Sequence, residues 1–291
     1  MTYLARLDAR VGRVGSVLCL GLDPSVEGLP DGFSRDLDGV ERFAALLLDA
    51  AVPYAAAVKP NLAFFEAYGS AGIAALERLR ARIPSDVPVI ADAKRGDIGT
   101  TAARQAVALF DVLEADAVTV NPYLGAEAIA PLLDRPDRFA YVLCRTSNPG
   151  AGELQDLVVA AEDRDGGAPA ERLHERVARL ASGWGPGGTV GLVVGATAPT
   201  ELAAIRAIAP GLPFLVPGVG AQGGDIDAVL ARGPATATPG STVRAGGLLV
   251  NVSRGIAAAA LGGSGIGPAG DLETRLARVA AEWAARLPVL P

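Results

Sequence analysis

Four charged side chains end two short apolar runs, and their types suit acid–base and electrostatic chemistry. Asp92 and Lys94 close the run 87–94, Asp97 follows three residues later, and Lys59 closes an earlier run. If these runs are β-strands, alternation sends Asp92 and Lys94 to the same face. Charges that converge in an apolar setting are costly unless they pair. A structural ion-pair network would explain any one of them, but their gathering at strand ends favours a functional site.

A glycine-rich segment and an arginine form a second candidate group, suited to binding an anion. The segment 217–224 includes Gln222, and its glycines let backbone amides approach an anion closely. Arg254 starts a helical pattern directly after the run 246–250, where a forked guanidinium and a helix N-terminus both favour phosphate. Arg244 is a rival donor, but it lies in a polar stretch before that run. We therefore expect Arg254 to bind a phosphate group.

Short apolar runs alternate along the chain with amphipathic segments of helical period. The runs predict strands at 16–23, 54–59, 87–94, 117–121, 139–144, 189–195, 213–217 and 246–250. The amphipathic segments predict helices at 40–51, 66–83, 100–113, 170–184, 200–208, 226–231 and 271–287.

This alternation predicts an α/β fold, a (β/α)8 TIM barrel that forms one catalytic domain over residues 1–291. An open doubly wound sheet is the alternative, but no Gly-x-Gly-x-x-Gly motif follows the first run. The polar stretches 150–169 and 233–246 are expected to be long loops.

The barrel prediction places the candidate residues at one end of the molecule, because functional groups of barrel enzymes lie at the carboxyl ends of the strands. Alternation turns Asp23, Lys59 and Asn61 into the barrel mouth together with the charged pair of the third strand. Arg95 follows the opposite phase and is expected to point outward, toward the helices. The mouth is therefore predicted to be the active site.

Composition limits the partners and the location. Lys plus Arg is 26 and Asp plus Glu is 32, a net charge of -6 that argues against nucleic-acid binding. Cys19 and Cys144 stand far apart in apolar runs and are expected to be buried thiols rather than a disulfide. No apolar run approaches the ~18 residues of a membrane span, and residues 1–14 lack a signal peptide's apolar centre. A soluble cytoplasmic protein without membrane contact is the prediction.

Six segments at the predicted strand ends resemble orotidine 5'-phosphate decarboxylases. The sequence Asp92-Ala-Lys-Arg-Gly-Asp97 matches the Asp-x-Lys-x-x-Asp signature of that family. Further similar segments are Leu20-Gly-Leu-Asp-Pro24, Val58-Lys-Pro-Asn61, Thr146-Ser-Asn-Pro-Gly150, Val194-Gly-Ala-Thr197 and the loop 217–224. The resemblance runs from about residue 17 to 255, and several variants are similar to those of the longer bacterial subgroup that includes the mycobacterial enzymes.

The resemblance implies decarboxylation of orotidine 5'-monophosphate to uridine 5'-monophosphate, the last step of de novo pyrimidine synthesis, without metal or organic cofactor. It implies that Lys94 protonates the ring carbon from which CO2 departs, and that Asp92 lies against the substrate carboxylate. Lys59 would hold the charge network and a ribose hydroxyl. Asp97 and Thr101 would reach into a neighbouring subunit's site, so a homodimer with shared sites is expected.

The resemblance also implies the substrate-binding residues. Asp23 would bind the ribose, Ser147 the pyrimidine ring, and Gln222 with Arg254 the phosphate, while Pro217 would join them at the start of the glycine-rich loop. The single histidine, His174, falls in a charged helical pattern and is expected to face solvent.

Two other functions fit parts of this pattern. A metal-dependent decarboxylase or aldolase acting on a sugar phosphate shares the Asp-x-Lys-x-x-Asp motif, but it needs a further acidic ligand where the second strand offers Lys59 and Asn61. A catalytically silent phosphate-binding barrel would have lost the charges at its strand ends, and here they are present.

Overall fold

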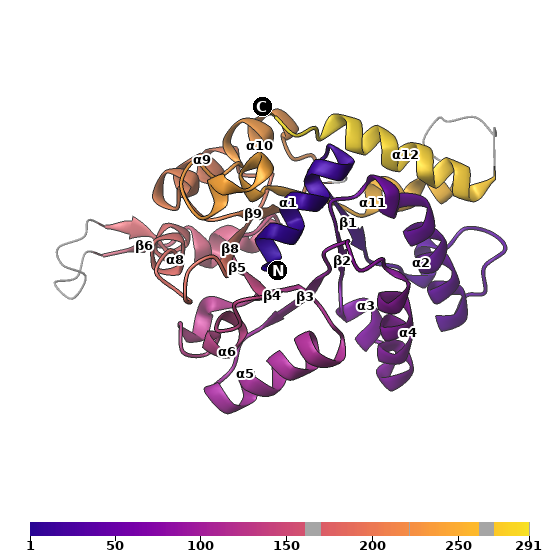
Figure 1. The fold of residues 1–291 in the computed structure, drawn as a ribbon, viewed down its shortest axis with the longest axis horizontal. Helices are drawn as coiled ribbons and strands as arrows, with labels where there is room; N and C mark the ends of the chain where they lie inside the picture. Colours follow the sequence, from indigo (N-terminus) through magenta and orange to yellow (C-terminus); the bar gives the residue numbers. More distant parts are fainter. Residues whose placement is uncertain (161–169, 221, 262–270, 291) are drawn as a thin grey trace.

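Parallel strands form the centre of the protein in a computed structural model that describes residues 1–160, 170–220, 222–261 and 271–290 (Figure 1). The eight-stranded sheet has the order β2-β1-β10-β9-β8-β5-β4-β3. Parallel bridges from Val58 to Val89 and from Asn61 to Asp92 join β2 to β3 and close the sheet into a barrel. The strands are β1 Leu18–Leu22, β2 Ala57–Pro60, β3 Ile90–Arg95, β4 Ala117–Val120, β5 Phe139–Arg145, β8 Val190–Val194, β9 Phe214–Val216 and β10 Leu249–Val252.

Each predicted strand is present, and the TIM-barrel prediction is confirmed. The last strand begins at Leu249, three residues later than predicted, because Arg244–Gly247 forms a tight 3-10 turn. Each predicted helix is also present. These are α2 Leu37–Ala51, α4 Gly69–Arg82, α5 Gly99–Ala106 with a π-helical continuation Val107–Val112, α8 Leu173–Ala181, α9 Pro199–Ile208, α10 Ile226–Arg232 and α12 Leu272–Arg286.

Two apolar layers hold the barrel together. The outer layer lies between strands and helices and contains alternate strand residues such as Val89 and Ala91. The inner layer fills the barrel with the intervening residues, among them Cys19, Ala57, Ile90, Phe139 and Leu249. This division follows from strand alternation, since both faces of a barrel strand are buried.

An N-terminal helix that the sequence analysis did not anticipate, α1 Tyr3–Val14, closes the barrel at the amino ends of the strands (Figure 1). Its apolar face, with Leu7 and Val11, packs against the inner layer. On its charged side, Arg6 pairs with the buried Asp116 and Arg10 bonds Asp86 at 2.9 Å. The helix therefore seals the end opposite the predicted active site.

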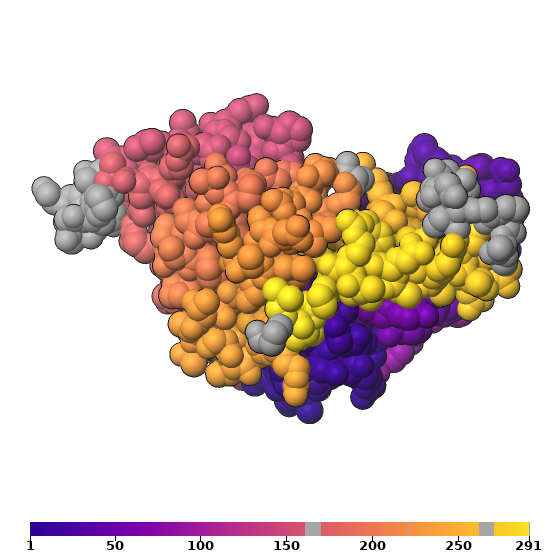
Figure 2. All heavy atoms as spheres, turned by 90° about the horizontal axis from the view of Figure 1, so that it is seen from above, coloured from indigo at the N-terminus to yellow at the C-terminus, as the bar shows by residue number. Residues whose placement is uncertain are grey.

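The C-terminal helix α12 lies along the surface beside the N-terminal part of the chain, as the yellow and indigo segments show in Figure 2. Asp271 caps this helix by accepting a hydrogen bond from the Thr274 amide at 2.8 Å. After the helix, Ser16 and Pro288 form an antiparallel bridge. The two ends of the chain are thus joined next to β1.

The long-loop prediction for 150–169 is partly wrong. Residues 152–155 form the short helix α7 Gly152–Gln155, and β6 Val158–Val159 pairs with β7 Glu171–Arg172 in a hairpin that projects from the body in Figure 1. Residues 161–169 lie outside the described residues. The stretch 233–246 is a loop with 3-10 turns, as expected.

Both cysteines are free and buried, as predicted. Burial raises the pKa of the Cys19 thiol to about 12 and raises that of Cys144 as well. Among the described helices, none combines the length and apolar character needed to cross a membrane.

Candidate active site

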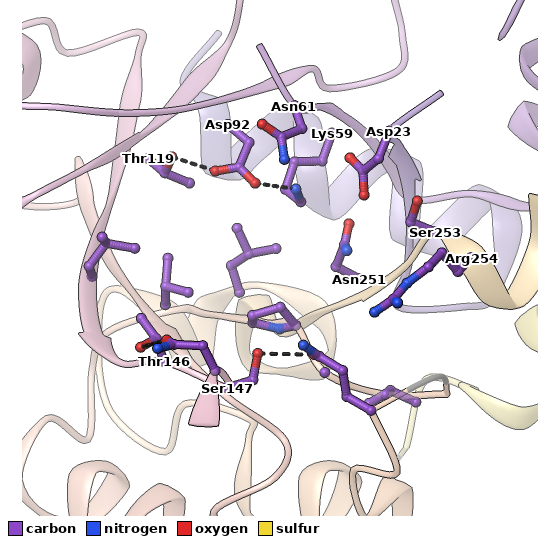
Figure 3. Close-up of a pocket in the computed structure, with 18 of the residues that line it drawn as sticks. Asp23, Lys59, Asn61, Asp92, Thr119, Thr146, Ser147, Asn251, Ser253 and Arg254 are labelled. Carbon is purple, nitrogen blue, oxygen red and sulfur yellow. Dashed lines mark hydrogen bonds and ion pairs between the residues drawn. The ribbon is translucent and has the colours of Figure 1, made fainter. Parts of the chain in front are cut away.

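A cavity of about 300 Å³ opens at the carboxyl ends of the barrel strands (Figure 3). Predicted site residues from six different strands or the loops after them line it. They are Asp23, Lys59, Asp92, Lys94, Ser147, Pro217, Gln222 and Arg254. The structure therefore brings together in one cavity residues that lie far apart in the sequence, from Asp23 to Arg254.

Asp92 lies between two lysines at the floor of this cavity. Its Oδ2 accepts a hydrogen bond from Lys59 Nζ at 2.5 Å, and its Oδ1 accepts one from Lys94 Nζ at 2.7 Å. Lys59 is 4% exposed, whereas the Lys94 side chain is half exposed toward the cavity. The carboxylate is thus shared between a buried, fixed ammonium group and one that can reach a bound ligand.

The charge state of this group follows from its contacts. Burial alone would raise the pKa of Asp92, but the nearby ammonium groups of Lys59 and Lys94 outweigh it and lower that pKa far below its usual range. Burial would likewise lower the pKa of Lys59, yet Asp92 and Asp23 raise it on balance. Asp92 is therefore an anion and Lys59 a cation at neutral pH.

The backbone at Lys94 departs from regular strand geometry. Lys94 has φ of 49°, and the pairing of β3 with β4 shifts register between Ala91 and Arg95. Left-handed φ is uncommon for a residue with a side chain, and such conformations cluster at functional sites. Thr119 fixes this turn, since its Oγ1 accepts hydrogen bonds from the backbone amides of Ala93 and Lys94 at 3.0 Å each.

Thr119 also donates a hydrogen bond from Oγ1 to Asp92 Oδ1 at 2.9 Å. Sequence reasoning missed this residue as a member of the site. The available signal was a single hydroxyl within the apolar run 117–121, on the inward phase of the strand. Thr119 therefore links the carboxylate of Asp92 to the backbone amide of Lys94.

Arg254 lines one end of the cavity (Figure 3). It begins the short helix α11 Arg254–Ala257 after β10, as predicted, and forms no ion pair with any residue in the described part of the chain. Arg244, by contrast, bonds Asp8 at 2.7 Å and does not line the cavity. The choice of Arg254 over Arg244 is consistent with this geometry.

Another part of the cavity wall comes from the loops after β5 and β9. The Ser147 hydroxyl donates to Oε1 of Gln222 at 3.1 Å and so links the two loops. The glycine-rich loop runs from Pro217, and Gly218 has φ of 98°; a Cβ added there would lie 2.9 Å from the Cβ of Ser147. Ala221 of this loop lies outside the described residues.

Two buried oxygen atoms in the cavity wall have no hydrogen-bond partner among the described residues: Asp23 Oδ1 and Asn251 Oδ1. Asn251 was not predicted as a site residue. The signal was its place two residues beyond Leu249, on the inward phase of the last strand.

Asp97 and Thr101 do not line this cavity. Thr101 instead borders a separate hollow between α4 and α5, and the Asp97 amide donates to the Ala128 carbonyl at 3.1 Å. Arg95 points outward and pairs with Glu66, as alternation predicted.

The prediction that His174 faces solvent is wrong. His174 is 1% exposed, and its Nδ1 lies 2.8 Å from the Gln155 carbonyl oxygen and 3.3 Å from Asp156 Oδ1. The reason is that the 150–160 segment folds back over α8 as part of the unpredicted hairpin unit. His174 is outside the cavity lining.

Across the described ranges, no three or more His, Cys, Asp or Glu side chains converge in a way that could hold a metal ion.

Comparisons with known proteins agree on one family. The family model "Orotidine 5'-phosphate decarboxylase / HUMPS family" matches residues 16–263. The chain is 47% identical over 257 residues to orotidine 5'-phosphate decarboxylase of Thermomicrobium roseum, covering 88% of this chain and 86% of that protein. It is 48% identical over 255 residues to the Roseiflexus castenholzii protein of the same name, with 87% and 88% covered. The structure of Leishmania donovani OMP decarboxylase superposes with a TM-score of 0.78 at 37% identity, covering 98% of this chain and 96% of that one.

Proposed function

The chain belongs to the orotidine 5'-phosphate decarboxylase / HUMPS family, and we propose that it converts orotidine 5'-monophosphate to uridine 5'-monophosphate and CO2 with Lys94 as the proton donor. This reaction is the last step of de novo pyrimidine biosynthesis. The observation that carries the proposal is the Lys59–Asp92–Lys94 chain in a cavity that also contains Arg254. The reaction needs no metal or organic cofactor in this proposal.

Asp92 acts on the substrate carboxylate by charge. A second carboxylate placed about 4 Å away would raise the energy of the bound substrate by ~4 kcal/mol at an effective dielectric near 20. This repulsion disappears when neutral CO2 leaves, and ~4 kcal/mol corresponds to roughly a thousandfold in rate. The two lysines hold Asp92 ionised, so the repulsion is present at neutral pH.

Lys94 stabilises and then protonates the carbanion. When the bond between the ring carbon and the carboxyl carbon breaks, its electron pair stays on the ring carbon, and Lys94 Nζ transfers a proton there. The ammonium group is already directed into the cavity by its contact with Asp92 at 2.7 Å. Because half of the Lys94 side chain is exposed, solvent can restore the proton after product leaves. A positioned cation serves both the developing anion and its protonation.

The remaining residues bind the rest of the nucleotide. Arg254 and Gln222 bind the phosphate, Ser147 binds the pyrimidine ring, Asp23 binds the ribose, and Pro217 starts the loop that covers the ligand. Phosphate contacts far from the reacting carbon supply binding energy that closes this loop and excludes water.

The active unit is a homodimer in which Asp97 and Thr101 complete the partner's site. Support comes from their position outside the cavity of their own chain, in a turn that also carries exposed Ile98. The segment after β4, whose Ala128 carbonyl accepts a hydrogen bond from the Asp97 amide, exposes the side chains of Tyr123 and Leu124, which are 81% and 54% accessible. Exposed large apolar side chains near polar side chains that take no part in their own chain's cavity are typical of a protein interface.

Three finer assignments complete the proposal. The variants at Lys59-Pro-Asn61 and Thr146–Gly150 support membership of the longer bacterial, mycobacterial-like subgroup. Residues 1–291 form one catalytic domain, supported by the packing of α1 into the barrel and the bridge from Ser16 to Pro288. The buried free thiols Cys19 and Cys144 support a cytoplasmic location, where thiols stay reduced.

The proposal is tested by incubating the purified protein with orotidine 5'-monophosphate in the presence of EDTA. We expect the absorbance of the orotate band to fall as substrate is consumed, and we expect the Lys94→Ala variant to lose this activity. An unchanged absorbance with the native protein would refute the function. Normal turnover in Lys94→Ala would leave the reaction intact but refute the role of the lysine.

A further inference from the structure

Asn251 is a buried polar residue that the mechanism above leaves unused. It is 9% exposed, its side chain lines the active-site cavity, and its Oδ1 has no hydrogen-bond partner among the described residues. An unpaired buried amide costs free energy in a folded protein unless something satisfies it. Such a group in a cavity wall is therefore expected to meet a bound ligand.

The fold gives Asn251 its orientation. In the parallel pairing of β10 with β1, Asn251 stands opposite Cys19, whose side chain belongs to the inner layer of the barrel. The side chain also passes over Gly21, where an added Cβ would lie 3.1 Å from Asn251 Oδ1. The missing side chain at Gly21 thus leaves room for the amide to extend into the cavity.

A second unpaired acceptor lies on the same wall. Asp23 follows β1 two residues after Gly21, and its buried Oδ1 also has no partner in the described chain. In Figure 3 the side chains of Asn251 and Asp23 point toward one another. A carboxylate oxygen repels phosphate and requires a donor, so this wall suits hydroxyl groups, which can both donate and accept.

The position of the two residues within the cavity identifies the part of the nucleotide that they meet. Lys94 and Asp92 mark the reacting end of the cavity, and Arg254 marks the phosphate end. In Figure 3, Asn251 lies between Asp92 and Arg254. In a nucleotide, the ribose lies between the base and the phosphate and carries two vicinal hydroxyls.

We propose that Asn251 is a further specificity-determining residue that hydrogen-bonds a ribose hydroxyl beside Asp23. This inference rests on the proposed function, because it takes the ligand to be a nucleotide bound in that orientation. It predicts that the protein distinguishes uridine 5'-monophosphate from its deoxy analogues through the Asn251 amide.

The test measures the affinity of the native protein and of Asn251→Ala for three probes by titration calorimetry: uridine 5'-monophosphate, its 2'-deoxy analogue and its 3'-deoxy analogue. For the native protein, each missing hydroxyl should weaken binding about fivefold or more, because a buried polar group is left unpaired. In Asn251→Ala, the loss caused by one of the two missing hydroxyls should shrink to about twofold or less.

Two further variants keep the test decisive. Asn251→Ser, which keeps a smaller polar group, replaces Asn251→Ala if the alanine variant fails to fold, with the same reduced discrimination expected. Thr189→Val is the matched control, since Thr189 is also buried with an unpaired hydroxyl but does not line the cavity. It should leave the affinities for all three probes unchanged.

The outcomes separate this inference from the function on which it rests. If the native protein binds uridine 5'-monophosphate and both deoxy penalties persist unchanged in the Asn251 variants, the inference is wrong and the proposed function stands. If the native protein fails to bind uridine 5'-monophosphate, the proposed function falls and the inference falls with it. A structural role for Asn251 would instead lower the unfolding midpoint of its variants without changing the deoxy penalties.

Discussion

Replacing Asp92 with asparagine isolates the stability that the buried charge pair contributes. The substitution keeps the shape of the side chain and removes one charge. Lys59, 4% exposed and 2.5 Å from Asp92, then retains Asp23 as its remaining anionic neighbour at the site. Removing one partner of a buried pair destabilises a protein by ~3–5 kcal/mol, because it leaves a buried charge uncompensated.

A second argument limits this loss. Lys59 can become neutral by releasing its proton. For a lysine with an ordinary pKa near 10.4, deprotonation at pH 7 costs about 4.6 kcal/mol of free energy. We therefore expect Asp92→Asn to lower the free energy of unfolding by about 3–4.5 kcal/mol. Adding Lys59→Met should recover part of this loss, because the unpaired ammonium group is then absent.

Equilibrium urea unfolding at pH 7, followed by far-UV circular dichroism, measures these differences. Glu41→Gln is the control, since it removes the carboxylate that bonds Arg78 at 2.6 Å on the surface and should leave the midpoint close to that of the native protein. Native stability in Asp92→Asn, or a double variant less stable than the single one, would refute the reasoning. Each Asp92 variant should also be inactive, which the loss of orotate absorbance checks separately.

Three further outcomes are expected. Arg254→Ala should raise KM by about tenfold or more, whereas Arg244→Ala should not, because only the former faces the cavity; equal effects in steady-state assays would contradict the assignment. The pKa of Asp92 is lowered in the folded state, so the charged carboxylate contributes its full stability above about pH 4, the ordinary pKa range of an unfolded carboxyl group. This contribution declines as the pH falls further. The urea midpoint of Asp92→Asn should therefore fall less on acidification than that of the native protein. Refolding equal amounts of inactive Lys94→Ala and Asp97→Ala together should restore about one quarter of the native rate. Half of the dimers formed are mixed, and each mixed dimer holds one intact site of its two. A mixture without activity would count against shared sites.

The sequence determined the barrel and most of the candidate site, because both depend on local patterns. Apolar runs of strand length separated by helical periods predicted every strand of the barrel, and the two-residue period of a strand placed Asp92 on the inward face. Parallel strands share a direction, so the residues after them had to meet at one end. That reasoning located Lys59 and Arg254, although they are far apart in the chain.

Only the tertiary structure decided contacts that depend on neighbouring strands and on chain segments without a strong period. Thr119 and Asn251 look like ordinary strand residues in the sequence, and what they contact follows from the neighbouring strand, which brings Asp92 beside Thr119 and Gly21 beside Asn251. The left-handed backbone of Lys94 is held by a hydrogen bond from its amide to the hydroxyl of Thr119, which lies on the neighbouring strand. His174 is buried because an unpredicted segment covers a helix whose charged pattern indicated exposure. The physical reason is that alternation fixes which way a side chain points, whereas its partners are fixed by packing between segments distant in the sequence.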